Sequence, residues 1–165
     1  MSSRTKDLFT GRAGEFAVLS EFLIRGYNVA VPSIDLGDDV LVIKDHQDDA
    51  EIARVQVKTA IGTRREYGYS ATFSTKYEQL ITPLTPELHY VFIARVRDRW
   101  KDMLLIPRED LDEAHRDRGI GSRSGKQSRL VTFYFRFHAD KVRCKDDDLQ
   151  KYRNAWEKYW KAVPR

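Results

Sequence analysis

The segment Pro32-Ser-Ile-Asp-Leu-Gly-Asp-Asp39 leads directly into the apolar run Val40-Leu-Val-Ile43, and a polar turn separates that run from Val55-Gln-Val-Lys58. The uninterrupted apolar run predicts a strand over 40–44 that is buried on both faces. Apolar and polar residues alternate over 52–59, which predicts the returning strand of a β-hairpin. This hairpin forms the centre of the predicted fold.

The predicted hairpin gathers polar groups that suit the hydrolysis of a phosphodiester. Gln56 and Lys58 share one face of the returning strand, and the turn brings that face back toward Asp39. A divalent cation held by oxygen ligands neutralises phosphoryl charge and ionises a water, and an ammonium group stabilises the developing charge.

The remaining segments predict a mixed β-sheet flanked by helices. Helices are expected over 10–25, capped by Thr10 and ended by Gly26, and over 75–81, 107–118 and from Asp146 onward. Further strands are expected over 28–31, 67–73, 89–96, 103–106 and 129–137. This order of elements belongs to the α/β or α+β class.

The last predicted helix carries an apolar stripe formed by Leu149, Tyr152, Trp156, Tyr159 and Val163. Residues at this spacing share one helix face, so the stripe is interpreted as core packing. A dimer seam or a base-stacking surface is the alternative.

Length and composition predict one soluble domain over 1–165, with a core at about 10–110 and a basic loop, strand and helix over 118–165. The chain has 165 residues, of which 41% are hydrophobic, and this is enough for a core. Its single cysteine, Cys144, excludes a disulfide framework and a cysteine-built metal site. The apolar runs fall short of the roughly 18 residues of a membrane span, and the first residues do not resemble a signal peptide. We therefore expect an intracellular, cytoplasmic protein with no membrane partner.

Charge is distributed unevenly along the chain. The net charge is +4, but the part up to Thr82 has 10 basic and 12 acidic residues, whereas the remainder has 19 basic and 13 acidic residues. A basic half beside an acidic half suits an anionic partner held next to a cation-binding site. An ordinary solvated surface is the alternative interpretation of the same numbers.

The basic residues of the second half concentrate in a glycine- and serine-rich loop, which suits contact with DNA phosphates because small residues let backbone amides approach them closely. The candidate DNA-binding residues of this loop are Arg118, Arg123, Lys126 and Arg129. Arg64 and Arg65, just after the predicted hairpin, are secondary candidates. A plain flexible loop is the alternative.

The hairpin resembles the core of the PD-(D/E)XK, or restriction-endonuclease-like, nuclease superfamily, in the variant in which glutamine replaces the acid before X-Lys. This Gln-X-Lys core is known in an intron-homing endonuclease branch. The segment Gly11-Arg-Ala-Gly-Glu15 is similar to the family's helix that carries an active-site glutamate. Tyr90-Val-Phe-Ile-Ala-Arg95 and Leu104-Leu-Ile-Pro107 resemble its later strands. The resemblance extends over about residues 10–110 of the chain.

The resemblance implies a restriction-endonuclease-like fold and a role for each matching residue. Asp39 would be the principal metal ligand, and Glu15 would support it directly or through water. Asp35 and Asp38 compete with Asp39 for the position of the motif aspartate, and we choose Asp39 because it directly precedes the buried strand. Gln56 would contribute an amide oxygen at the position of the second acid, the carbonyl of Val57 would be a further ligand, and Lys58 would be the catalytic lysine. Because glutamine carries no charge, we expect weaker metal binding than with an acid at position 56.

These features together predict a Mg²⁺-dependent DNA endonuclease in a homing- or resolvase-like role, with Mn²⁺ able to substitute. Because cutting both strands of a duplex usually takes two active sites, a homodimer or higher homo-oligomer is expected. The alternative is a non-catalytic DNA-binding or regulatory module that retains the nuclease fold, and Gln56 is its main support. A third interpretation is an interaction protein that uses the C-terminal aromatic helix and does not bind nucleic acid.

Overall fold

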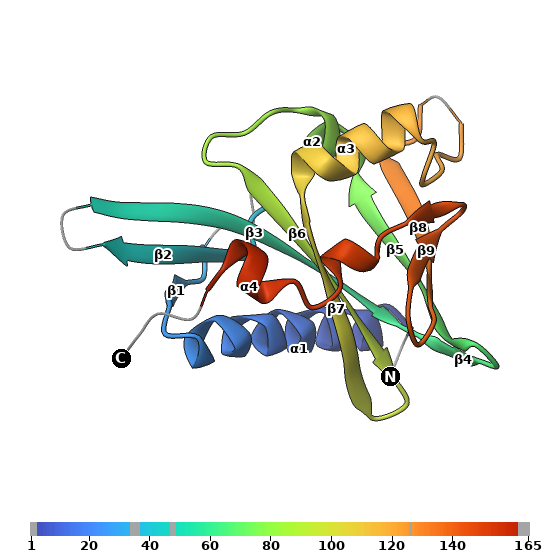
Figure 1. Ribbon diagram of the computed structural model, residues 1–165, viewed down its shortest axis with the longest axis horizontal. Helices are drawn as coiled ribbons and strands as arrows, with labels where there is room; N and C mark the ends of the chain where they lie inside the picture. The colour runs from blue at the N-terminus through green and yellow to red at the C-terminus, as the bar shows by residue number, and fades with distance from the viewer. Residues whose placement is uncertain (1–2, 34–36, 47–48, 126, 162–165) are drawn as a thin grey trace.

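The computed structural model describes residues 3–33, 37–46, 49–125 and 127–161, which form two five-stranded sheets and their flanking helices (Figure 1). The helices are α1 (Ser3–Ile24), α2 (Tyr77–Ile81), α3 (Arg108–Asp117), the 3₁₀ turn η1 (Gln150–Tyr152) and α4 (Trp156–Tyr159). The strands are β1 (Asn28–Ala30), β2 (Val40–His46), β3 (Asp49–Ile61), β4 (Thr63–Arg65), β5 (Gly68–Lys76), β6 (Leu88–Val96), β7 (Arg99–Pro107), β8 (Leu130–Phe137), β9 (Val142–Cys144) and β10 (Asp147–Asp148). The expected class, a mixed sheet flanked by helices, is confirmed, although a second sheet accompanies the first.

The first sheet has the strand order β1-β2-β3-β6-β7 and contains the predicted hairpin. Strands β2 and β3 pair antiparallel, with Val40 opposite Val55, and β3 pairs parallel with β6, with Val57 opposite Val91. The expectation that β2 is buried on both faces is wrong, because Leu41 and Ile43 are only half-buried. Only the face of Val40 and Val42 lies in the core.

The second sheet is antiparallel and has the strand order β10-β9-β8-β5-β4. The chain passes from β3 of the first sheet to β4 of the second through Gly62. The Gly62 N–H donates to the carbonyl of Arg95, and a Cβ at this glycine would lie 2.8 Å from the Val96 side chain. Gly62 therefore lets the two sheets approach closely where the chain crosses between them.

The first sheet lies between the second sheet and α1, and each face has its own core. Aromatic side chains fill the space between the sheets, where Phe92 of β6 lies with its ring centroid 5.3 Å from that of Phe73 and 5.1 Å from that of Phe135. On the opposite face, Val18 and Phe22 of α1 pack with Val55 and Val57 of β3 and with the C-terminal tryptophans. Alternate residues of β3 therefore contact different layers.

Helix α1 is longer than predicted. It begins at Ser3, so Thr10 lies inside the helix and the prediction that Thr10 caps it is wrong. Its end is as expected, because Gly26 follows with a φ of 87°, a left-handed conformation that glycine adopts without strain. Residues 6–9 of α1 are exposed, so the apolar periodicity of a core-facing helix did not detect this part of it.

The predicted helix from Asp146 onward is wrong. Strands β9 and β10, the η1 turn and the short α4 occupy this region instead. Asn154 has a φ of 49°, and its side chain accepts from the Met103 N–H at 2.9 Å and donates to Asp102 at 2.9 Å. These bonds to β7 replace the helical hydrogen bonds that a continuous helix would make.

The aromatic stripe of this segment nevertheless packs in the core, as interpreted from the sequence. Tyr152, Trp156 and Trp160 are at most 5% exposed, and the Trp160 ring lies 5.1 Å from that of Phe22. A surface-exposed aromatic seam is therefore excluded for these three side chains. Val163 lies outside the described residues. Among those residues, no helix has the length and apolar character needed to cross a membrane.

Candidate active site at the start of strand β2

Asp39, immediately before β2, is fixed by two hydrogen bonds to β3. Its N–H donates to the Val55 carbonyl at 2.9 Å, and its carboxylate Oδ2 accepts from the Val57 N–H at 2.7 Å. Asp39 is thus bonded to both residues that flank Gln56. Because the N–H and C=O of a strand residue point to the same side, the Val57 carbonyl is directed to the side of Asp39. The carboxylate and this carbonyl are therefore neighbours.

Asp38, the neighbouring acid, is held in a separate interaction with Arg54. The Arg54 Nε lies 3.0 Å from each carboxylate oxygen, and its Nη2 lies 3.0 Å from Oδ2. This forked contact between half-buried partners ties the chain before β2 to β3. Asp38 therefore has a structural partner, whereas Asp35, the other competitor for the ligand position, lies outside the described residues.

Gly37 anchors the same segment to helix α2. Its φ is 108°, and its carbonyl accepts a hydrogen bond of 2.7 Å from Nε2 of Gln79. A Cβ at position 37 would overlap with that amide group, so the close approach requires glycine. Residues 37–39 are thus clamped between β3 and α2, and neither clamp was foreseen from the sequence, because Gln79 and Arg54 carry no local motif.

Gln56 points into the protein with an unfilled acceptor. It is 3% exposed, and among the described residues its Oε1 has no hydrogen-bond partner. A buried polar atom without a partner costs about 1–3 kcal/mol, which a ligand can recover. An amide oxygen, a carboxylate and a backbone carbonyl form an oxygen donor set that a hard divalent cation prefers.

These oxygen donors fit a hard divalent cation, but the donor set carries little negative charge. Asp39 supplies one negative charge, whereas the Gln56 amide and the Val57 carbonyl supply none. Among the described parts of the chain, no group of three or more His, Cys, Asp or Glu side chains could hold a metal ion. A cation here would therefore keep several waters, as Mg²⁺ commonly does in proteins.

Lys58 and Glu15 lie on different sides of the first sheet. Lys58 is half-buried and shares the face of Gln56, two residues further along β3. Glu15 belongs to α1, which covers the opposite face, and it forms an ion pair of 2.5 Å with Arg12. Gly14, just before it, is in close contact with Thr59. The structure thus gathers Asp39, Gln56, Val57 and Lys58 on one hairpin and places Glu15 on the neighbouring helix.

The arginines predicted to bind DNA in the loop after α3 have partners within the chain. Arg118 forms ion pairs of 3.0 Å with both Glu113 and Asp147. The Arg123 guanidinium lies 3.7 Å from the centroid of the Tyr77 ring and donates to the Ser128 carbonyl at 2.8 Å. Arg129 is exposed, and Lys126 lies outside the described residues. Much of the positive charge of this loop is therefore used to hold the loop in place.

Arg64 and Arg65 lie on β4 and are both exposed. Arg65 donates to the Ser70 hydroxyl at 3.2 Å. Arg64 lines two hollows, one with a volume of about 490 Å³ and one of about 640 Å³. These two residues thus lie at the edge of the second sheet, on the chain that continues from Lys58.

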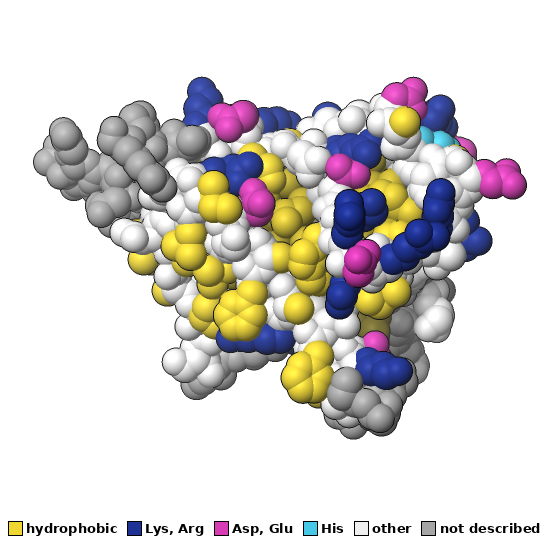
Figure 2. Space-filling model, turned by 90° about the horizontal axis from the view of Figure 1, so that it is seen from below, with side chains coloured by type: hydrophobic (Ala, Val, Ile, Leu, Met, Phe, Trp, Pro, Cys, Tyr) yellow, Lys and Arg dark blue, Asp and Glu magenta, His cyan; other side chains and the backbone are white. Residues whose placement is uncertain are grey.

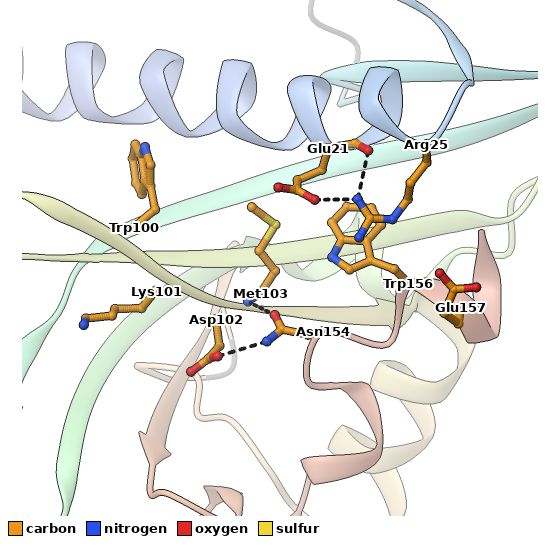
Figure 3. Close-up of a pocket in the computed structure, with 9 residues that line it drawn as sticks. All are labelled: Glu21, Arg25, Trp100, Lys101, Asp102, Met103, Asn154, Trp156 and Glu157. Carbon is orange, nitrogen blue, oxygen red and sulfur yellow. Dashed lines mark hydrogen bonds and ion pairs between the residues drawn. The ribbon is translucent and has the colours of Figure 1, made fainter. Parts of the chain in front are cut away.

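A pocket between α1, β7 and the C-terminal segment has a volume of about 620 Å³, and several of the residues around it bind one another (Figure 3). Arg25 pairs with Glu21 at 2.5 Å and lies 4.4 Å from the centroid of a Trp156 ring. Burial raises the pKa of Asp102, but hydrogen bonds from Arg153 and Asn154 outweigh it and hold the pKa below its usual value. These groups fasten the C-terminal segment to the first sheet.

The fold is a nuclease-like α+β fold, and a comparison with solved structures supports this class. It finds similarity to a bacterial homing endonuclease, I-Ssp6803I, with a TM-score of 0.52 and 15% sequence identity, covering 94% of this chain and 90% of that chain. At this identity the likeness establishes the fold alone. A scan against protein-family models and a search of curated proteins found no match.

Proposed function

We propose that the protein is a divalent-metal-dependent DNA endonuclease. The observation that carries the proposal is the Asp39 carboxylate bonded to the N–H of Val57, the residue after Gln56, whose buried side-chain oxygen has no partner among the described residues. The fold shared with a bacterial homing endonuclease supports the assignment of the substrate as DNA. The resemblance to the Gln-X-Lys variant of the PD-(D/E)XK superfamily is part of the same proposal.

In this proposal, Asp39, Gln56 and the Val57 carbonyl hold Mg²⁺, with Mn²⁺ able to replace it. The bound cation supplies charge neutralisation at the phosphoryl group and acidifies a water. The clamps on residues 37–39 keep the Asp39 carboxylate in one orientation, so little reorganisation is needed when the substrate binds. Glu15 would contribute through a water from the side of α1.

Lys58 acts on the substrate side of this arrangement. Its ammonium group would orient the attacking water or stabilise the charge that develops on the phosphoryl oxygens. Because Gln56 is neutral, the site holds its cation less tightly than a site with two acids would. We therefore expect activity to require millimolar rather than micromolar metal concentrations.

A second copy of the chain is part of the proposal, because cutting both strands takes two sites. Helix α1 exposes large apolar side chains that would be buried in such a dimer: Leu8, Phe9, Phe16, Leu23 and Ile24, each between 49% and 69% exposed. Figure 2 shows hydrophobic side chains grouped on the face that α1 occupies. Phe16→Glu should reduce the mass measured by light scattering to that of a monomer, whereas Tyr134→Glu on the second sheet should not.

The catalytic proposal is tested by incubating supercoiled plasmid and duplex DNA with the purified protein and Mg²⁺ or Mn²⁺. Wild type should nick or linearise the plasmid, and chelation of the metal should stop the reaction. Lys58→Ala should lose most of the activity, whereas the control Lys151→Ala, an exposed lysine of η1, should retain it. The same plasmid products from wild type and Lys58→Ala would contradict the catalytic role.

The second candidate function is a DNA-binding or regulatory module that does not cut. The neutral Gln56 favours it, together with the lack of a three-residue metal-ligating cluster among the described residues. A gel shift separates the two functions. A module binds duplex DNA equally well with and without a divalent metal and leaves it intact, whereas an endonuclease yields cut products once Mg²⁺ is added.

A further inference from the structure

Two β-hairpins form a basic cleft at the edge of the molecule. The first hairpin is β4–β5, and the second is β6–β7, whose turn lies at Arg97 and Asp98. Between them lies a hollow of about 490 Å³, lined in part by Arg64, Tyr69, Arg97, Arg99 and Lys101. In Figure 1, β4 and the turn of β6–β7 project from the same side of the molecule. We call this hollow the two-hairpin cleft.

The cationic side chains of the two-hairpin cleft form no ion pair with the carboxylates of the described residues. Arg64, Arg97, Arg99 and Lys101 are all exposed, and no carboxylate of the described residues forms an ion pair with any of them. Among the described residues, Asp98 is the one acid that lines the cleft. Arg118, in contrast, has two carboxylate partners. The cleft therefore offers cations that an anion can reach without breaking ion pairs.

The walls of the cleft are held by contacts within the chain. The Tyr69 ring stacks on Phe137 at 4.3 Å, and its hydroxyl donates to Asp102 at 3.3 Å. At the base of the two hairpins, the Gly62 N–H donates to the Arg95 carbonyl at 2.9 Å. Because both hairpins are fixed where they meet, their cationic side chains occupy a preorganised frame, which lowers the entropic cost of binding.

We propose that the two-hairpin cleft binds the sugar-phosphate backbone of the DNA substrate, and that the β6–β7 turn is thereby part of the DNA-binding surface. Guanidinium groups suit phosphate oxygens because they donate two parallel hydrogen bonds. The position is appropriate, since the chain that carries Lys58 continues through Gly62 to Arg64. This inference rests on the proposed function for the identity of the ligand and extends it by assigning Arg97, Arg99 and Lys101.

The test measures binding of a non-cleavable duplex, in the presence of a chelator, over a series of salt concentrations. Each phosphate contact contributes about 0.9 to the slope of log K against log salt concentration. The double variant Arg64→Gln/Arg97→Gln should reduce the magnitude of this slope by about 1.8 for two lost contacts. The matched control Arg116→Gln/Lys151→Gln removes the same charge from two exposed residues outside the cleft, and its slope should equal that of wild type.

The outcomes separate this inference from the proposed function. An unchanged slope in the cleft variant, with normal plasmid cutting by wild type, would overturn the cleft and leave the endonuclease in place. A reduced slope in the cleft variant, with no cutting by wild type under any metal, would support the cleft and overturn the endonuclease. A slope that falls only in the control variant would overturn the cleft and place the DNA-binding surface elsewhere on the molecule. A wild type that does not bind duplex DNA would overturn both.

Discussion

The start of β2 and the loop after α3 are both rich in charged residues, but they use these residues differently. Before β2, Gly37 and Asp38 are held by Gln79 and Arg54, whereas the nearby Gln56 oxygen has no partner among the described residues. In the loop after α3, Arg118 and Arg123 are themselves held by partners within the chain. The comparison teaches that the availability of a polar group, rather than the number of charges, indicates where a ligand binds.

The largest effect should follow from removing the Asp39 charge. Asp39→Asn keeps the shape of the side chain but removes the one charged cation ligand on the hairpin, and we expect plasmid cutting to fall by about 10²–10³-fold. Arg118→Gln, the matched change in the loop, should alter the cutting rate by less than about twofold. Initial rates at saturating Mn²⁺ measure both. Equal losses in the two variants would remove the distinction between the regions.

Acid should destabilise the first sheet before the second. Burial, followed by the positive charge of Lys44, lowers the pKa of His89 to about 4 from its usual 6.5. Neutral His89 therefore makes the folded state more stable above pH 6.5 than in acid. This part of the free energy of unfolding is lost as the pH falls toward 4, because His89 of the unfolded chain takes up its proton first. Between pH 7.5 and pH 5 the free energy of unfolding should fall by about 2 kcal/mol from this group alone.

Urea denaturation at each pH measures this loss, and His89→Phe should reduce it by the same amount. The ring of His89 packs against Tyr159 and Trp160 of the C-terminal segment. Hydrogen exchange at pH 5 should therefore accelerate first in β6 and the residues around α4. An acid response in His89→Phe as large as that of wild type would show that another group is responsible.

Gly37, before β2, and Gly119, in the loop after α3, allow the backbone constraints of the two regions to be compared. Gly37 and Gly119 both have a positive φ, of 108° and 67°, but only Gly37 has a side chain packed against the position where a Cβ would lie. Gly37→Ala should lower the free energy of unfolding by about 2 kcal/mol, and Gly119→Ala by about 1 kcal/mol. Gly37→Ala should also slow plasmid cutting, because the displaced loop moves Asp39. Chemical denaturation and cutting rates test both changes.

The smallest expected effect concerns the two ion pairs. A double-mutant cycle with Arg54→Gln and Asp38→Asn should give a coupling energy of about 1 kcal/mol, since both partners are at most 20% exposed. The same cycle with Arg118→Gln and Asp147→Asn should give about 0.5 kcal/mol or less, because Arg118 is 37% exposed. A larger coupling for the second pair would contradict the expectation that the more exposed ion pair is the weaker one.

The sequence predicted the local features well because they depend on neighbouring residues. The apolar run before Lys44 and the alternation around Gln56 correctly indicated the β2–β3 hairpin, and Pro107 marked the start of α3. The strand over 89–96 was also evident from its apolar residues. In each case a few consecutive side chains determine the local conformation.

The features that were missed depend on contacts between distant segments. The parallel pairing of β3 with β6 and the bonds from Gln79 and Arg54 to residues 37–38 leave no local pattern. The stripe after Asp146 has helical spacing, but the hydrogen bonds of Asn154 to β7 outweigh that preference. The cationic turn at Arg97 has the composition of an ordinary polar turn, and only the neighbouring β4 shows it to be a wall of a cleft.

The continuous path from β3 through Gly62 to β4 has a consequence for where a cut would fall. Arg64 lies six positions after Lys58, and at about 3.3 Å per extended residue this offset spans about 20 Å, comparable to six base-pair steps of 3.4 Å. The covalent chain, rather than a movable loop, would then fix the distance along the DNA between the phosphate bound by Arg64 and the phosphodiester cut near Lys58. Two residues inserted beside Gly62 would shift the cut along the duplex, whereas one would turn Arg64 to the other face.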